Sequence, residues 1–253
     1  MRATVLLLLP CLLIAGSYDA DGDGVADAHD VVATDADNDG TFDRPSPAGS
    51  RPFFSDTLTL TQVWTSGSVL NNQWDACCGY FDDDSLLDIL GHHWNPNMLH
   101  VFESDGAGRY NHVWEQTESL PPASYVSVTA GDPDDDGHIE LLGGECSTLG
   151  KVVILNNTGN DSWGNPHCGI SVPNQHIRTV RVADTNRNDT NEVIVVSGDV
   201  SGGAVDIFEH AGAPGAQVYR KIYEYTTVSY LFQAEIGDAD NDGYPEILLG
   251  VGG

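Results

Sequence analysis

Short segments in which apolar and polar residues alternate recur along most of the chain, and each comes just before a cluster of acidic residues. This alternation is typical of β-strands with one buried face. A short apolar run follows each cluster, and two further β-rich segments precede the next cluster. The alternating segments are Tyr125–Ala130, Ile177–Ala183 and Leu231–Ile236. The first of the later β-rich segments are Met98–Phe102, Lys151–Leu155 and Ala204–Phe208, and the second are Val113–Trp114 and Val218–Tyr225. No helical period interrupts this region, so we expect an all-β structure.

The acidic clusters themselves repeat. Gly131-Asp-Pro-Asp-Asp-Asp-Gly-His-Ile-Glu140 returns almost unchanged as Gly237-Asp-Ala-Asp-Asn-Asp-Gly-Tyr-Pro-Glu246. Two weaker copies begin at Asp184, with amides at the third and fifth positions and Asp189 at the sixth, and at Tyr80, which replaces the first acid. The first positions are therefore 52, 52 and 54 residues apart. Such regularity indicates a repeated structural unit.

Four short strands per repeat of about fifty residues are typical of one blade of a β-propeller. We therefore predict an all-β fold, a β-propeller of four-stranded blades with an acidic loop in each. A β-sandwich whose acidic turns merely resemble one another is the alternative.

The order of oxygen-bearing residues within each loop suits a calcium ion. Side-chain oxygens stand at positions 1, 3 and 5, a backbone carbonyl at 7 and a carboxylate at 9, while Gly at 6 allows a sharp turn. Mg²⁺ would keep more water and need fewer carboxylates. An EF-hand would need Glu at position 12, where Gly143 and Leu249 stand, and a strand follows position 9 directly. A turn that holds no metal remains the alternative for each loop.

Composition supports the metal interpretation. The chain has 38 acidic and 10 basic residues, a net charge of −28. Such a charge argues against nucleic-acid partners and anionic membranes. More than half of the acids stand at predicted ligand positions once two further loops, at Asp19 and Asp35, are included. This placement disfavours a simple solubilising acidic surface.

The sequence near the N-terminus indicates that the protein is exported. Val5–Ala15 is apolar but too short to span a bilayer, and small residues precede a cleavage point at Tyr18, so residues 1–17 read as a signal peptide. Tandem calcium loops at 18–43 and a Pro-rich linker at 44–56 follow, and the propeller repeats occupy 57–253. No later segment has membrane-spanning length. We therefore expect a secreted or cell-surface protein.

Four cysteines remain after the signal peptide. Cys77 and Cys78 would point to opposite faces of a strand, and Cys146 with Cys168 is the candidate disulfide. A zinc site built on cysteines is disfavoured because no CxxC spacing exists.

No catalytic signature is found in the sequence. The segment 144–151 departs from a phosphate-binding loop, and HExxH and GxSxG are absent. His92 and His93 would face opposite sides of a strand, which disfavours a joint metal site. Loops opposite the acidic ones offer a candidate ligand surface at Trp94, Asn95 and Asn97, where sugar stacking or a protein hot spot competes with simple packing of the Trp.

The GDxDxDGxxE pattern followed by Ile or Leu, at about fifty-residue spacing, resembles the FG-GAP/VCBS repeats of integrin alpha-subunit-type β-propellers. The resemblance covers residues 57–253 and implies one blade per repeat, calcium on one rim and usually seven blades. The loops at 19 and 35 are similar to thrombospondin type-three calcium repeats. The metal ligands that these resemblances imply are Asp19, Asp21, Asp23 and Asp27; Asp35, Asp37, Asp39 and Asp43; Asp82, Asp84 and Asp88; Asp132, Asp134, Asp136 and Glu140; Asp184, Asn186, Asn188 and Glu192; and Asp238, Asp240, Asp242 and Glu246.

The number of repeats departs from the family. Four loops are present and one strand follows the last loop, so we expect about four blades, a partial propeller. An open propeller leaves strand edges unpaired, which allows self-association; a four-bladed closure using Thr57–Trp64 is the alternative.

These features together predict a calcium-rigidified module that binds an extracellular protein or glycan. Two alternatives stay open: a polysaccharide-active, lyase-like enzyme and a structural spacer of a longer surface protein.

Overall fold

The structure is a computed structural model. It describes residues 64–67, 69–70, 74–82, 84–93, 97–117, 125–172, 176–199, 201–239 and 245–252, with only the backbone at 165–168. Residues Ser66–Gly253 form one compact unit. The predicted signal peptide, the loops at 19–43 and the linker lie outside the described residues.

The described chain contains β-strands and no helix. Its strands are β1 (Cys77–Gly79), β2 (Asp88–His93), β3 (Met98–Ser104), β4 (Tyr110–Glu115), β5 (Tyr125–Gly131), β6 (Glu140–Glu145), β7 (Lys151–Gly159), β8 (Ser162–Ser171), β9 (Ile177–Ala183), β10 (Glu192–Asp199), β11 (Gly202–His210), β12 (Tyr219–Thr227), β13 (Tyr230–Gly237) and β14 (Glu246–Gly252). The predicted all-β class is confirmed, and β9 coincides with its predicted segment.

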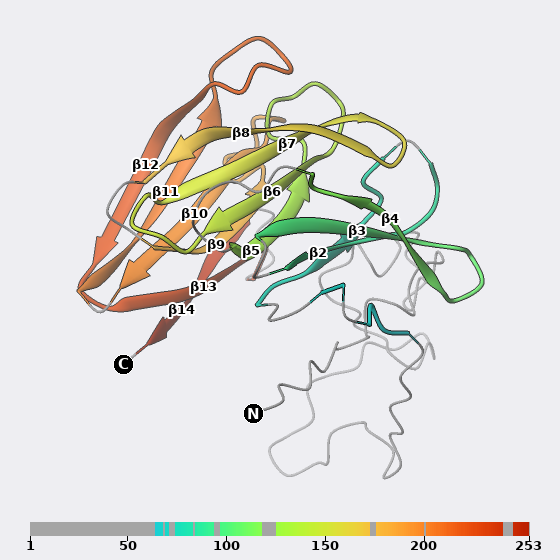
Figure 1. The fold of residues 1–253 in the computed structure, drawn as a ribbon. Coiled ribbons are helices and arrows are strands. Elements are labelled where there is room, and N and C mark those ends of the chain that lie inside the picture. Colours follow the sequence, from blue (N-terminus) through green and yellow to red (C-terminus); the bar gives the residue numbers. More distant parts are fainter. Residues whose placement is uncertain are drawn as a thin grey trace, which may run out of the picture. The chain divides into compact units, whose positions relative to one another are not determined.

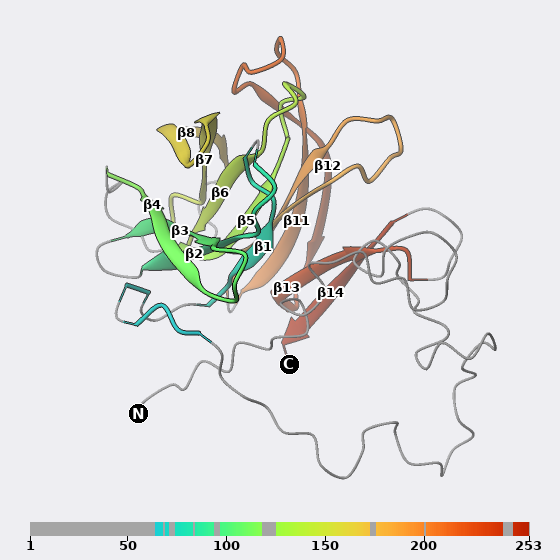
Figure 2. The same ribbon diagram turned by 90° about the vertical axis from the view of Figure 1, so that its right-hand side faces the viewer.

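The strands form four antiparallel sheets in which neighbours in sequence are neighbours in space (Figures 1 and 2). We call them sheet 1 (β1–β4), sheet 2 (β5–β8), sheet 3 (β9–β12) and sheet 4 (β13–β14). The first strand of each sheet packs against the first strand of the next, since β5 contacts β1 and β9, and β9 contacts β13. The chain is thus a succession of separate meanders.

Three apolar clusters fill the spaces between successive sheets. Adjacent residues of one strand serve different clusters: Leu141 packs between sheets 1 and 2, whereas Leu142 packs between sheets 2 and 3. The same division separates Val193 from Ile194, which packs between sheets 3 and 4. Strands β6 and β10 are therefore buried on both faces, which explains why their sequences are continuous apolar runs rather than alternating ones.

Sheets 2 and 3 approach each other closely where β6 faces β9. A Cβ added to Gly144 of β6 would lie 2.7 Å from methyl carbons of both Ile177 and Val180 on β9. A side chain at this position would separate sheets 2 and 3, so the glycine is required by packing.

A polar network joins the first strands of all four sheets. Asp75, just before β1, accepts hydrogen bonds at Oδ2 from Ser127 Oγ on β5 (2.8 Å) and from Arg181 NH1 on β9 (3.1 Å). The NH2 group of Arg181 donates to Glu235 Oε1 on β13 at 3.0 Å. Ser127 Oγ also accepts from the backbone N–H of Val180 at 3.0 Å. Arg181 of sheet 3 therefore links Asp75, which precedes sheet 1, to Glu235 of sheet 4.

The cysteine predictions have mixed outcomes. Exposure alternates along β1, where Cys77 is half-buried and Cys78 exposed. The predicted Cys146–Cys168 disulfide is wrong, because Cys146 is a free thiol. Cys146 follows β6, and its Sγ lies 3.5 Å from His176 Nδ1 and accepts from Arg178 NH1 at 3.6 Å, whereas Cys168 is paired with Val153 within sheet 2.

We predict that Arg181→Met lowers the free energy of unfolding by about 2 kcal/mol, because it leaves the half-buried carboxylate of Asp75 without its cation and removes the ion pair with the exposed Glu235. Arg220→Met is the matched control, since the side chain of Arg220 is 67% exposed and its one ion pair among the described residues is with Glu209 of the adjacent strand. Urea unfolding measures both. Equal losses in the two variants would contradict a linking role for Arg181.

Candidate metal centres

Each acidic segment joins the first two strands of its sheet: 80–87 joins β1 to β2, 132–139 joins β5 to β6, 184–191 joins β9 to β10, and 238–245 joins β13 to β14. Antiparallel order places these four loops at one end of their sheets and the β2–β3, β6–β7 and β10–β11 turns at the other end. The predicted ligand positions therefore occupy equivalent places in the four sheets.

The loops share one hydrogen-bonding frame. In the loop at 132, Asp132 Oδ1 accepts from the N–H of Asp136 (3.2 Å) and Oδ2 from that of Gly137 (2.9 Å). Asp184 accepts from Asn188 and Asp189 at the same spacings, at 3.2 and 3.0 Å. The side chain at position 5 accepts from the N–H at position 7 in three loops, at Asp84, Asp136 and Asn188. Carboxylates at position 1 thus organise the turn that holds the others.

The turn needs left-handed backbone at positions 4 and 6. Asp135 and Gly137 have φ of 59° and 87°, and Arg187 and Asp189 have 60° and 65°. Position 6 therefore favours Gly, as the sequence suggested, while Asp189 adopts the strained conformation with a side chain.

The carboxylate at position 9 has a fixed partner in three loops. The N–H at position 2 donates to it from Phe81 to Asp88 (2.9 Å), from Thr185 to Glu192 (2.8 Å) and from Ala239 to Glu246 (2.7 Å). In the loop at 132, position 2 is Pro133, which has no N–H. Glu140 Oε2 accordingly has no hydrogen-bond partner, although Glu140 is fully buried.

Four predicted ligands converge in this loop. Carboxylate oxygens of Asp132, Asp134, Asp136 and Glu140 all lie within 4.8 Å of one another. Asp134 is fully buried, and its Oδ1 lacks a partner as well. Burial, reinforced by the neighbouring carboxylates, raises the pKa of Asp134 to about 6 and that of Glu140 to about 9. The four groups repel one another unless a cation lies among them.

Sheet 3 holds this loop from the side. Gln217 Nε2 donates to Asp134 Oδ2 at 2.6 Å, and Asn191 Nδ2 donates to the backbone oxygen of Asp132 at 2.9 Å. An ion bound here would therefore order the junction between sheets 2 and 3 as well as the loop.

Two acidic residues from outside the loop at 80 lie against its predicted ligands, which the sequence did not indicate. Carboxylates of Asp82, Asp84 and Glu103 lie within 4.8 Å of one another, and Glu103 comes from β3, where it pairs with Asp88. Asp161, in the β7–β8 turn of sheet 2, donates its backbone N–H to Asp82 Oδ2 at 2.9 Å. Finding Glu103 would have required the β2–β3 register, and finding Asp161 the packing of sheet 2.

Neighbouring carboxylates repel one another in the loop at 80 too. Asp88 is fully buried with an unpartnered Oδ1, and burial with the nearby carboxylates raises its pKa to about 7. Burial and a hydrogen bond with Asp84 raise the pKa of Glu103 to about 7 as well. Glu103 supplies the carboxylate that Tyr80 cannot.

The loop at 184 is closed by its own amides. Asn186 Nδ2 donates to Glu192 Oε1 at 2.6 Å, and Thr185 donates to Oε2, so both oxygens of this buried carboxylate are satisfied. The predicted ligands Asp184, Asn186, Asn188 and Glu192 lie in one loop, but donors already occupy the position-9 oxygens. The amide substitutions thus do part of what a cation would do.

The remaining predicted ligands are described only in part. Asp238 and Glu246 flank the fourth loop, while Asp240, Asp242 and the ligands at 19–43 lie outside the described residues.

Of the three residues of the predicted protein- or glycan-binding surface, the structure describes only Asn97. Asn97 is buried, and its Oδ1 accepts from the backbone N–H of Tyr125 at 2.7 Å, which links sheets 1 and 2. This contact favours a packing role for Asn97. Trp94 and Asn95 lie outside the described residues.

Comparison with known sequences finds no match: no protein-family profile matches the chain, and no curated protein sequence matches it significantly. In the described part, no helix is long and apolar enough to cross a membrane.

A buried carboxyl group also lies outside the loops. Glu145, at the end of β6, has neither oxygen hydrogen-bonded, and burial raises its pKa to about 7 against the weaker effect of Lys151. It lies across the strand pair from Tyr125. Ionising Glu145 therefore opposes folding.

We predict that Asp134→Asn abolishes most of the stabilisation that calcium confers through the loop at 132, because a central ligand is lost. Asp135→Asn is the matched control, with the same charge change at an exposed position whose left-handed backbone suits Asn. At a calcium concentration 100 times the dissociation constant, one site contributes about 2.7 kcal/mol. Thermal unfolding with calcium and with a chelator measures this, and equal calcium responses in both variants would contradict the assignment.

A second prediction concerns pH. A carboxyl whose pKa is raised on folding stabilises the native state below its unfolded value, and this advantage is lost as pH rises through about 7. Glu145→Gln should therefore stabilise the protein more at pH 8 than at pH 5, by a difference of the order of 2 kcal/mol. Urea unfolding of variant and wild type at both values tests this. A difference independent of pH would show that Glu145 does not titrate in this range.

Proposed function

We propose that this chain is a calcium-binding β-propeller module, exported to the cell surface or beyond, that presents its loops to an extracellular protein or glycan. The observation that carries the proposal is the cluster formed by Asp132, Asp134, Asp136 and Glu140, where two fully buried carboxylates, Asp134 and Glu140, each keep an oxygen without a partner. Buried carboxylates are stable only when paired or when they coordinate a metal.

The chemistry of the cluster favours calcium. All of its candidate ligands are oxygens, which hard cations prefer, and four carboxylates in a turn with adaptable geometry suit Ca²⁺ better than the strict octahedron of Mg²⁺. The net charge of −28 with 10 basic residues adds a reason, because bound cations would relieve self-repulsion.

A structural role for the metal follows from its surroundings. Gln217 and Asn191 of sheet 3 hold the loop at 132, and Asp161 and Asn157 of sheet 2 hold the loop at 80 through Asp82 and the backbone oxygen of Phe81. Each ion would therefore fasten one sheet to the next. The ligand carboxylates would be taken up in coordination, so they would not act as a catalytic acid or base.

The propeller architecture is supported by the order of the sheets. Sheets 1, 2 and 3 each have four strands in meander order, and the first strand of each packs beside the first strand of the next. Blades of a propeller have this order. The resemblance of the loops to FG-GAP/VCBS repeats supports the same architecture.

We predict that the purified protein binds members of an array of extracellular proteins and glycans in millimolar calcium and loses that binding in chelator, because the ions order the sheets that carry the loops. Asp134→Asn should weaken the binding and Asp135→Asn should not. Binding that ignores calcium would contradict the proposed role of the ions. Release of a cleaved glycan would favour the enzyme, and absence of binding would favour the spacer.

A further inference from the structure

Sheet 1 carries a group of histidines whose placement depends on a β-bulge. Along the β3–β4 pair, His100 is opposite Glu115, Val101 is opposite Trp114 and Phe102 is opposite His112, so Val113 is an extra residue in β4. Residues three apart on a regular strand face opposite sides, but the inserted residue brings them to the same side. His112 and Glu115 therefore share the face of His100, while Val113 and Trp114 both pack on the apolar cluster between sheets 1 and 2.

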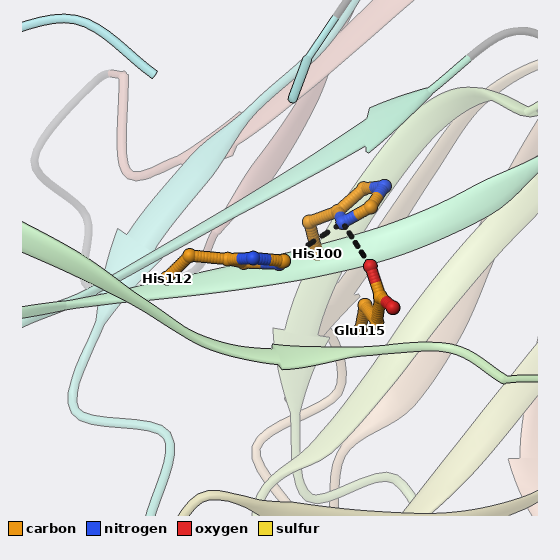
Figure 3. Close-up of side chains that lie close together, drawn as sticks. All are labelled: His100, His112 and Glu115. Atoms are coloured by element: carbon orange, nitrogen blue, oxygen red, sulfur yellow. Dashed lines mark hydrogen bonds and ion pairs between the residues drawn. The ribbon is translucent and has the colours of Figure 1, made fainter. Parts of the chain in front are cut away.

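The three side chains converge on one point (Figure 3). Nδ1 of His100 lies 3.1 Å from Nε2 of His112 and 3.8 Å from Oε2 of Glu115, and one ligand atom from each residue lies within 4.8 Å of the others. Ligand atoms around a tetrahedral zinc ion with bonds of about 2.0–2.1 Å are separated by roughly 3.3 Å. The observed separations are close to that value.

The environment combines a fixed ligand with an open approach. His100 is 3% exposed, whereas His112 and Glu115 are exposed at the surface of the outer strand β4. The His93 ring lies beside His100, with ring centroids 6.1 Å apart. Nε2 of His93 and Nε2 of His100 are buried with no hydrogen-bond partner in the described part of the chain. Internal hydrogen bonds therefore do not satisfy this group of rings.

The cluster is separate from the acidic loops. Glu103, which belongs to the cluster in the loop at 80, lies on β3 three residues after His100. Because β3 pairs with β2 in a regular register, the two side chains face opposite sides of sheet 1. The ligand types also differ, since two imidazoles and one carboxylate suit zinc and related transition metals, whereas Ca²⁺ prefers oxygens alone.

We propose that His100 Nδ1, His112 Nε2 and Glu115 Oε2 form a binding site for a divalent transition-metal ion of the Zn²⁺ class. Three protein ligands leave a fourth position for water or for His93. The site does not depend on the calcium assignment, and it is a second kind of metal centre in the same chain.

The test uses Co²⁺ as a spectroscopic probe for Zn²⁺. The full protein is titrated with Co²⁺ in millimolar calcium, which saturates the acidic loops, and the visible absorption of tetrahedral Co²⁺ is followed. We expect one band that saturates and that Zn²⁺ displaces. His112→Ala and Glu115→Gln change exposed side chains, so both variants should fold, which circular dichroism verifies. Each should raise the dissociation constant by more than about 100-fold, because losing a residue that only orients a ligand already costs about 10- to 100-fold.

Asn111→Ala is the matched control, an exposed residue of the same strand that offers no ligand to the cluster. It should bind Co²⁺ as the wild type does. Absence of a tetrahedral band in the wild type, or equal Co²⁺ affinity in the His112 and Glu115 variants and the control, would overturn the proposal. In that event the 3.1 Å contact is an ordinary hydrogen bond between two imidazoles.

Discussion

The junction between sheets 2 and 3 must accommodate two fully buried carboxyl groups, Asp134 and Glu140. Burial of a carboxylate without a partner is costly, and here two further carboxylates lie within 4.8 Å of them. Pro133 sharpens the problem because it lacks the N–H that donates to one oxygen of the position-9 carboxylate in the other three loops. Protonation or a bound cation must compensate, and a bound cation would also order the loop that sheet 3 holds through Gln217 and Asn191.

The rest of the described chain is arranged around such junctions. Apolar clusters fill the spaces between successive sheets, and the Asp75–Ser127–Arg181–Glu235 network joins their first strands. The acidic loops complete the junctions at one end. Variation among the loops is informative: the loop at 80 recruits Glu103 and Asp161, whereas the loop at 184 replaces ionic contacts with amide hydrogen bonds. We infer that the loops differ in how strongly they require a metal.

Local features were predictable from the sequence, and long-range ones were not. Alternation located β5, β9 and β13, and the spacing of acids located the loops between first and second strands. The sequence also indicated a sharp turn at position 6, where Gly137 has a positive φ. Strand register and sheet packing decided the rest: Glu103 reaches the loop-80 cluster because it pairs with Asp88, and His112 joins His100 and Glu115 because Val113 is bulged. The Cys146–Cys168 pairing failed for the same reason, since residue spacing says nothing about which turns meet.

The most direct measurement is the anomalous X-ray scattering of crystals grown in calcium. We predict a calcium peak at coordination distance, about 2.3–2.6 Å, from carboxylate oxygens of Asp132, Asp134, Asp136 and Glu140. A well-ordered loop at 132 with no such peak, in protein saturated with calcium, would contradict the claim that a bound cation compensates these buried charges.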